Sequence, residues 1–110
     1  MDKKQAEKNI KIFAFRVKAK FKPEQILLFG SYATGKFTPY SDLDIAVISS
    51  KFKSIPREKR LDVLYPLTAD LYPDFHVFGF TPEEFNQASP LTTVAEIKKQ
   101  AIDLTSLVYY

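Results

Sequence analysis

The chain has 110 residues, about the size of one domain, which excludes a two-domain enzyme. Its 45% hydrophobic and 26% charged residues are typical of a globular protein, so we expect a single domain over residues 1–110. The absence of cysteine excludes a thiolate metal site and a cysteine nucleophile, so any metal would be bound by oxygen. No apolar stretch is long enough for a membrane helix and no apolar signal core is present, so a cytoplasmic protein without membrane contact is expected.

The formal net charge of +3 is unevenly distributed along the chain. Residues 1–22 hold eight Lys or Arg, whereas residues 62–110 hold seven acids and only two lysines. A basic segment can attract nucleic acid, but lysines scattered along an amphipathic helix more often form a solvated face. We therefore do not expect nucleic acid to be the direct substrate.

The first elements are a helix and a short strand. An amphipathic helix is predicted over residues 3–21, because apolar residues recur at helical spacing with lysines between them. The four apolar residues 26–29 predict a buried strand that leads into a turn at Gly30 and Ser31. A connection rich in turn residues follows over 32–40.

The second half is predicted to alternate strands with helices. Residues 42–49 predict a strand whose two faces alternate, and a helix begins near Pro56. A third strand is predicted over 74–80, and Thr81 would cap a short helix after it. A final helix is predicted over 91–107, capped near Ser89, with an apolar stripe formed by Val94, Ile97, Ala101, Leu104 and Leu107. The predicted fold class is α+β, a small mixed sheet with helices packed on it.

Two pieces of the sequence combine into one candidate site. Gly30 permits a tight turn and close approach of a phosphate, and Ser31 opens a helical turn whose N–H groups and hydroxyl can bind phosphate oxygens. Asp42 and Asp44 point to the same side of their strand, so their oxygens can hold divalent cations for phosphoryl transfer. Each piece alone is weak, since a Gly-Ser pair is common in loops and Ser41-Asp42 could merely cap the start of a strand.

Together these residues resemble the minimal nucleotidyltransferases of the DNA polymerase β superfamily, whose signature is a Gly-Ser turn followed by Asp-x-Asp. The resemblance covers nearly the whole chain and implies the polymerase-β-like palm fold. It also implies a third carboxylate, for which Asp74 is the matching position and Asp70 the less favoured one. Asp42, Asp44 and Asp74 would then be the catalytic and metal-binding residues. The nucleotide and its phosphates would contact Gly30, Ser31, Lys36 and Ser41.

His76 lies on the same predicted strand face as Asp74, two residues further on. A lone strand histidine is more often packed or half-exposed than catalytic, so we do not assign it a catalytic role. The turn also lacks an arginine that many family members carry, since Tyr32 and Thr34 stand there. Positive charge near the triphosphate would then come from Lys36, from the basic loop 51–60 or mainly from metal.

The resemblance implies transfer of AMP from ATP, with two Mg²⁺ ions, or Mn²⁺ in their place, as cofactors. Stand-alone chains of this size resemble the MNT antitoxins, MntA-like protein adenylyltransferases that modify a separately encoded HEPN-domain ribonuclease toxin. Two alternatives stay open: a small-molecule nucleotidyltransferase of the aminoglycoside-modifying kind, and a catalytically silent module that binds a partner. The sequence leaves homo-oligomer formation open.

Overall fold

The structure is a computed structural model that describes residues 3–38, 40–87 and 93–105. The helices in these ranges are α1 (Lys3–Phe21), α2 (Arg60–Leu64), α3 (Pro82–Asn86) and α4 (Thr93–Gln100). Three 3-10 turns, Ser50–Ser54, Arg57–Lys59 and Tyr65–Thr68, surround α2. The strands are β1 (Gln25–Phe29), β2 (Leu43–Ile48), β3 (Phe75–Phe80) and β4 (Ile102–Asp103).

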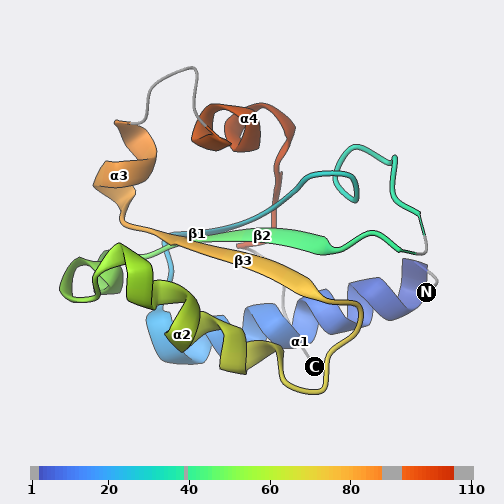
Figure 1. Cartoon of the computed structure of the whole chain (residues 1–110), viewed down its shortest axis with the longest axis horizontal. Helices are drawn as coiled ribbons and strands as arrows, with labels where there is room; N and C mark the ends of the chain where they lie inside the picture. Colours follow the sequence, from blue (N-terminus) through green and yellow to red (C-terminus); the bar gives the residue numbers. More distant parts are fainter. Residues whose placement is uncertain (1–2, 39, 88–92, 106–110) are drawn as a thin grey trace.

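The strands form one mixed sheet in the order β3-β2-β1-β4. β1 pairs antiparallel with β2 and with β4, whereas β2 and β3 are parallel. As a result, the end of β1 and the beginnings of β2 and β3 meet at the same end of the sheet, on the right of Figure 1. This end carries the candidate site.

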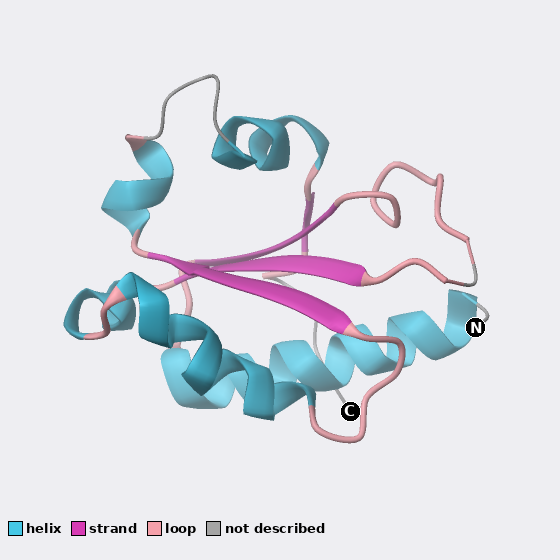
Figure 2. Cartoon of the chain, viewed as in Figure 1, coloured by secondary structure: helices cyan, strands magenta, loops and turns pink. Residues whose placement is uncertain are grey.

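Helices cover both faces of the sheet (Figure 2), with α1 and α2 on one face and α3 and α4 on the other. The alternation predicted for residues 42–49 is confirmed. Leu43, Ile45 and Val47 belong to the larger core, which packs on α1, whereas Ala46 and Ile48 pack with Val94 and Ile97 of α4. Asp42 and Asp44 therefore belong to the α4 face, near the end of the sheet.

The prediction of a final helix over 91–107 is wrong for residues 101–105. α4 ends at Gln100, and β4 pairs with Leu27 and Leu28 of β1. The amide of Leu104 donates to the carbonyl of Ile26 at 2.7 Å. The backbone of β1 has hydrogen-bonding groups on its free edge, and these groups would stay unsatisfied if the residues after Gln100 continued the helix. Helical periodicity in the sequence cannot reveal such distant partners. The predicted cap near Ser89 and the stripe residue Leu107 lie outside the described residues.

The predicted strands and the cap at Thr81 agree with the structure, with small changes at the ends of the strands. The predicted strands 26–29, 42–49 and 74–80 correspond to β1, β2 and β3. The helix predicted near Pro56 is instead divided into α2 and two 3-10 turns, the second of which contains Pro66. Thr81 caps α3 as expected, since its hydroxyl accepts from the Glu84 amide at 3.1 Å. Among the described residues, none of the helices has the length and apolar character needed to cross a membrane.

Candidate active site

The first part of the site is the tight turn that follows β1. Gly30 adopts a φ of 76°, in the left-handed region that glycine occupies without strain. Its carbonyl accepts from the Thr34 amide at 3.2 Å, and the Ser31 carbonyl accepts from the Lys36 amide at 2.9 Å. Tyr32 packs partly against the core on the α1 face, which fixes the turn to the body of the sheet.

The second part is the pair of aspartates at the start of β2. Asp42 directly precedes the strand and Asp44 is its second residue, so both side chains lie on one face. Phe29 pairs with Asp44 across the sheet, which brings the Gly30 turn beside the Asp44 carboxylate. A Cβ at Gly30 would lie 2.1 Å from Oδ2 of Asp44. Only a glycine allows the turn to pass this close to the carboxylate.

His76 completes the cluster, and the sequence analysis did not assign it to the site. It pairs with Asp44 in the parallel register of β2 and β3. Its Nε2 lies 3.2 Å from Oδ2 of Asp42, and its Nδ1 lies 3.3 Å from Oδ1 of Asp44. The imidazole thus bridges the two carboxylates, and these contacts are ion pairs when His76 is protonated. The sequence signal was its place on the third strand, on the face predicted to carry Asp74.

Electrostatics distinguish the two aspartates. The side chain of Asp44 is 23% exposed, compared with 37% for Asp42. Burial raises the pKa of Asp44 above its usual value, and the His76 imidazole opposes this rise. The neighbouring carboxylate of Asp42 raises the pKa further. A cation placed against this pair would relieve both the burial and the repulsion of the carboxylates.

Asp74 lies at the same end of the sheet but outside this contact cluster. It directly precedes β3, and its backbone carbonyl accepts from the Leu43 amide at 3.0 Å. Its side chain is exposed, and no described contact joins it to Asp42 or Asp44. Within the described residues, no three His, Cys, Asp or Glu side chains are arranged to hold a metal ion. The role of Asp74 as third carboxylate stays a prediction, as does the alternative at Asp70.

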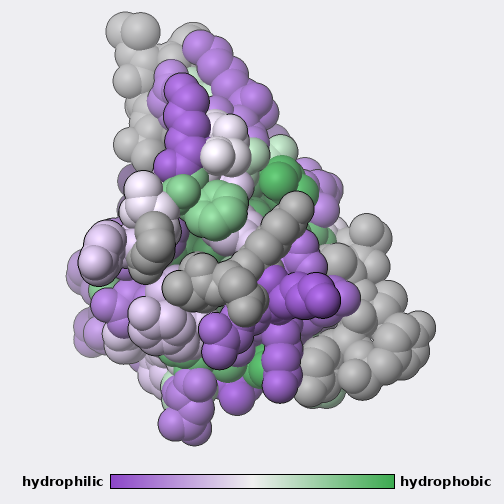
Figure 3. All heavy atoms as spheres, turned by 90° about the vertical axis from the view of Figure 1, so that its right-hand side faces the viewer, coloured by the Kyte–Doolittle hydropathy of each residue, from purple (hydrophilic) through white to green (hydrophobic). Residues whose placement is uncertain are grey.

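Ser41 and Lys36 lie in the connection between the turn and β2. The Ser41 hydroxyl accepts from the Thr38 amide at 2.8 Å, and its amide donates to the Thr38 carbonyl at 3.0 Å. These two bonds shape the chain just before Asp42. Lys36 is exposed beside the turn. Figure 3 faces this end of the molecule, where the visible surface is largely hydrophilic around a small group of hydrophobic side chains.

A separate pocket of about 590 Å³ lies between α1, the turn and β4. Ile10, Leu28 and Leu104, which line it, belong to the core on the α1 face. The aspartates belong to the opposite face of the sheet. This pocket is therefore not the place where the carboxylates would act.

Comparison with known proteins gives the family. Residues 10–105 match the family described as nucleotidyltransferase domain. A solved structure described as a toxin-antitoxin with AMP-PNP is 26% identical, with a TM-score of 0.61, over 87% of this chain and 71% of that one. No curated protein matches the sequence closely enough to count as a relative.

Two further structures share the fold at lower identity. A candidate nucleotidyltransferase from Sulfolobus solfataricus is 17% identical, with a TM-score of 0.59, over 94% of this chain and 88% of that one. BolA1 from Arabidopsis thaliana is 12% identical, with a TM-score of 0.51, over 76% of this chain and 98% of that one. The likeness to the Sulfolobus structure confirms the α+β fold with a mixed sheet, and the match over residues 10–105 shows that the chain belongs to the nucleotidyltransferase domain family.

Proposed function

We propose that this nucleotidyltransferase transfers AMP from ATP to a hydroxyl group of another protein, a HEPN-domain ribonuclease toxin that the transfer silences. The main observation that supports this reaction is the contact between the Gly30 turn and the Asp44 carboxylate, with Asp42 beside it. A turn suited to phosphate and a pair of carboxylates suited to a cation thus meet at one point.

Asp42 and Asp44 provide part of what a divalent metal site needs. Asp42 and Asp44 offer carboxylate oxygens, which Mg²⁺ and Mn²⁺ prefer, and their mutual repulsion favours a cation. These two residues would hold the metals, with Asp74 as the proposed third ligand. When bound, the metals would lower the pKa of the acceptor hydroxyl and neutralise charge on the pyrophosphate that leaves.

The chain's own residues position the reactants. The absence of a side chain at Gly30 lets the turn pack directly against the Asp44 carboxylate, which brings the phosphate-binding turn next to the pair of aspartates. His76 holds Asp42 and Asp44 on one side of the sheet before substrates bind. Lys36 is the exposed cation nearest to the turn in sequence, and we propose that it contacts the triphosphate, with Ser31 and Ser41 as further phosphate contacts. No side-chain nucleophile is required, because catalysis of this kind rests on positioning and charge.

Two observations support a protein as the acceptor. Residues 10–105 are accounted for by the nucleotidyltransferase domain itself, so within this range specificity would come from a surface that docks the acceptor. The solved structure described as a toxin-antitoxin with AMP-PNP is 26% identical over most of this chain, which supports a protein partner and a nucleotide substrate.

The test is to incubate the purified chain with ATP, Mg²⁺ and a separately encoded HEPN-domain protein. Intact-protein mass spectrometry is expected to show the HEPN protein gaining whole AMP units while its ribonuclease activity falls. The Asp42→Asn variant serves as the control and is expected to add no mass. Transfer to a free aminoglycoside, without modification of the protein, would support the small-molecule alternative. Silencing of the ribonuclease without added mass, also by Asp42→Asn, would support the binding-module alternative.

A further inference from the structure

Two phenylalanines lie beside the carboxylates on the same face of the sheet. Phe29 is the last residue of β1 and pairs with Asp44 in the antiparallel register. Phe78 follows His76 by two residues on β3, so its side chain leaves the strand on the face of the aspartates. The two phenyl rings are in contact, with centroids 5.8 Å apart and planes tilted by 48°. Phe29 and Phe78 are called the aromatic pair below.

The two rings of the aromatic pair differ in their surroundings. Phe29 is half-buried and packs against the smaller core, to which α4 contributes Val94 and Ile97. Phe78 is 40% exposed, although phenylalanine is among the residues most often buried. The aromatic pair thus presents one exposed ring next to the carboxylates, and the other ring supports it from β1.

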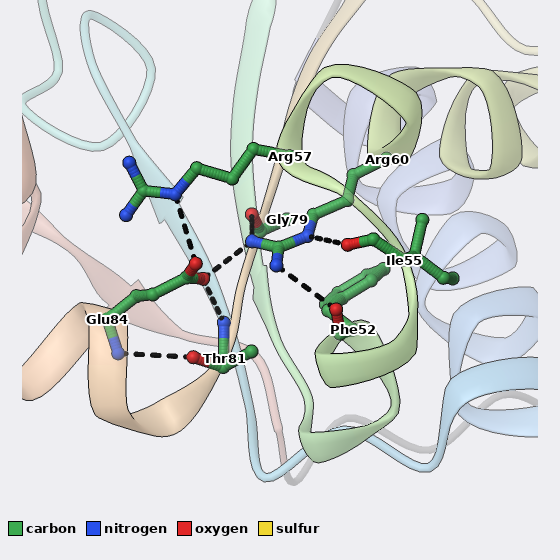
Figure 4. Close-up of polar contacts among 7 residues, drawn as sticks. All are labelled: Phe52, Ile55, Arg57, Arg60, Gly79, Thr81 and Glu84. Atoms are coloured by element: carbon green, nitrogen blue, oxygen red, sulfur yellow. Dashed lines mark hydrogen bonds and ion pairs between the residues drawn. The ribbon is translucent and has the colours of Figure 1, made fainter.

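The backbone of β3 is fixed directly after Phe78. The Gly79 carbonyl accepts from the guanidinium of Arg60 at 3.2 Å, as Figure 4 shows. The same guanidinium donates to two further backbone carbonyls at 3.0 Å each and pairs with Glu84. The Arg60 side chain is buried among these partners, so it does not offer a free charge to a ligand at the aromatic pair. A ring on a strand that is held in this way needs little ordering when a ligand binds.

The other exposed Phe and Tyr side chains of the described residues lie elsewhere; they are Phe15, Tyr40, Tyr65 and Tyr72. Phe15 is on α1 and Tyr65 is in the turn after α2, on the opposite face of the sheet (Figure 2). The carbonyl of Tyr72 accepts from Asn9 of α1. Tyr40 lies in the connection before Asp42 and is 94% exposed. Within the part of the chain that the structure describes, Phe78 is therefore the exposed phenyl ring that a strand holds on the carboxylate face.

The distance between the aspartates and Phe78 suits a nucleoside. Asp44 pairs with His76, so Phe78 lies one strand across from Asp44 and two residues along the sheet. With a strand spacing of about 5 Å and a rise of about 3.3 Å per residue, the two Cα atoms are about 8 Å apart. In a nucleoside triphosphate, a single ribose separates the α-phosphate from the base. A base whose α-phosphate lies at the aspartates therefore comes within reach of the exposed ring.

We infer that the aromatic pair binds the base of the nucleoside triphosphate, which stacks on the exposed ring of Phe78. The inference rests on the proposed function, which puts the phosphates at the Gly30 turn and the aspartates, and it deepens that function by placing the base. Stacking on an aromatic ring accepts every base, because each base has a π face. We therefore expect GTP to bind about as tightly as ATP, since both are purines with the same stacking area.

The first experiment uses fluorescence. The chain contains no tryptophan, so Phe78→Trp introduces a single indole and keeps an aromatic ring at this position. Mg·ATP is expected to quench its emission, whereas Mg·tripolyphosphate, which lacks base and ribose, is expected to leave it unchanged. Phe15→Trp is the matched control, because Phe15 is 54% exposed on the opposite face of the sheet. Its emission is expected to respond to neither ligand.

The second experiment measures affinities by calorimetry. Phe78→Ala is expected to weaken Mg·ATP binding about tenfold and to leave Mg·tripolyphosphate binding unchanged, because it removes only the stacking surface. A loss that came from a damaged site would weaken both ligands alike. Phe78→Trp is expected to bind Mg·ATP at least as tightly as the unsubstituted chain. Tyr40→Ala removes the exposed ring beside Asp42 and is expected to leave both affinities unchanged.

Several outcomes would overturn the inference. One is equal affinity of Phe78→Ala and the unsubstituted chain for Mg·ATP, and another is an indole at position 78 whose emission ignores saturating Mg·ATP. A loss of affinity in Tyr40→Ala alone would place the base at the connection before Asp42. Normal binding of Mg·ATP by Phe78→Ala with loss of the acceptor protein would assign the exposed ring to the acceptor.

The two proposals fail separately in these experiments. If the indole responds to Mg·ATP but the unsubstituted chain adds no AMP to the HEPN-domain protein, the base site stands and the proposed reaction does not. If AMP is added and Phe78→Ala binds Mg·ATP as the unsubstituted chain does, the reaction stands and the base lies elsewhere. Absence of Mg·ATP binding by the unsubstituted chain would overturn both.

Discussion

Gly30 shows how one residue can connect the turn to the chemistry. A methyl group at this position would occupy the place of the Asp44 carboxylate, 2.1 Å from its Oδ2. Gly35 has nearly the same backbone conformation, with a φ of 77°, but no atom lies within 4 Å of its Cβ position. The two glycines therefore share a left-handed backbone, which would strain any other residue, and differ in their contact with Asp44.

Gly30→Ala is expected to lower AMP transfer about a hundredfold or more, because displacing a reacting group by an ångström can cost that much. Gly35→Ala is expected to lower stability by about 1 kcal/mol from backbone strain and to keep most of the activity. Steady-state assays of transfer with thermal unfolding of both variants measure these effects. Equal losses of activity in the two variants would show that strain, and not the contact with Asp44, is decisive.

The aspartates give a second prediction at the same scale. Asp42→Asn or Asp44→Asn is expected to reduce AMP transfer on the order of 1,000-fold and to weaken Mg·ATP binding, because each removes charge at the proposed metal site. The rate of AMP transfer is measured with labelled ATP, and the affinity for Mg·ATP is measured by calorimetry. Wild-type rates in both variants would exclude the pair from catalysis.

The third carboxylate is tested by a matched pair outside the His76 cluster. Asp74→Asn is expected to lower turnover more than Mg·ATP binding, as a ligand beside the attacking oxygen would. Asp70→Asn is the control: Asp70 is exposed and has a φ of 65°, which asparagine tolerates. If Asp70→Asn lost activity and Asp74→Asn kept it, the assignment of Asp74 would be wrong.

Among the elements, the junction of β3 with α3 depends on a single carboxylate. Glu84 closes the capping box with Thr81 and accepts from Arg57 and Arg60. Burial alone would raise its pKa, but Arg60, the Thr81 amide and Arg57 outweigh it and lower the pKa to about 2. Arg60 is itself buried, so losing its partner would leave a buried charge unpaired.

This lowered pKa predicts how stability depends on pH. Because the pKa is lower in the folded state, Glu84 stabilises the fold fully above its ordinary value of 4.5, and this contribution is lost as pH falls towards about 2. At pH 7, Glu84→Gln is expected to lower the free energy of unfolding on the order of 2 kcal/mol. Urea unfolding at pH 7 and near pH 2 measures the difference, which is expected to shrink in acid.

Glu83→Gln is the control at the adjacent position. Glu83 pairs with Lys53 at 3.0 Å, but both side chains are more than half exposed. A much smaller change in stability is expected, since solvent screens exposed pairs. An effect of Glu83→Gln as large as that of Glu84→Gln would contradict the role given to the buried Arg60.

In the molecule as a whole, the residues that form the larger core and the residues proposed for catalysis lie on different faces of the sheet. The larger core lies between the sheet and α1, whereas the carboxylates lie on the opposite face at one end of the sheet. α1 thus lies on the face of the sheet opposite to the carboxylates (Figure 1). Its residues Lys4, Lys8, Lys11 and Lys20 are exposed, as expected for a solvated face. The apolar pocket beside α1 belongs to that same layer, so a hollow in the fold does not by itself mark the active site.

The sequence by itself determined the elements whose signals are local. The alternation of apolar residues along β2 predicted that both aspartates lie on one face of the sheet. The Gly-Ser pair predicted the turn before them. Thr81 predicted the start of α3, because a helix cap needs only neighbouring residues. These features depend on contacts within a few residues, which a pattern can reveal.

Only the tertiary structure decided the features that need a partner distant in sequence. Residues 102–103 form a strand and not the end of a helix, because the open edge of β1 offers them hydrogen bonds. His76 joins Asp42 and Asp44 because the parallel register of β2 and β3 aligns it with Asp44, and periodicity on one strand does not fix that register. The contact of Gly30 with Asp44 likewise follows from strand pairing and not from either residue's neighbours.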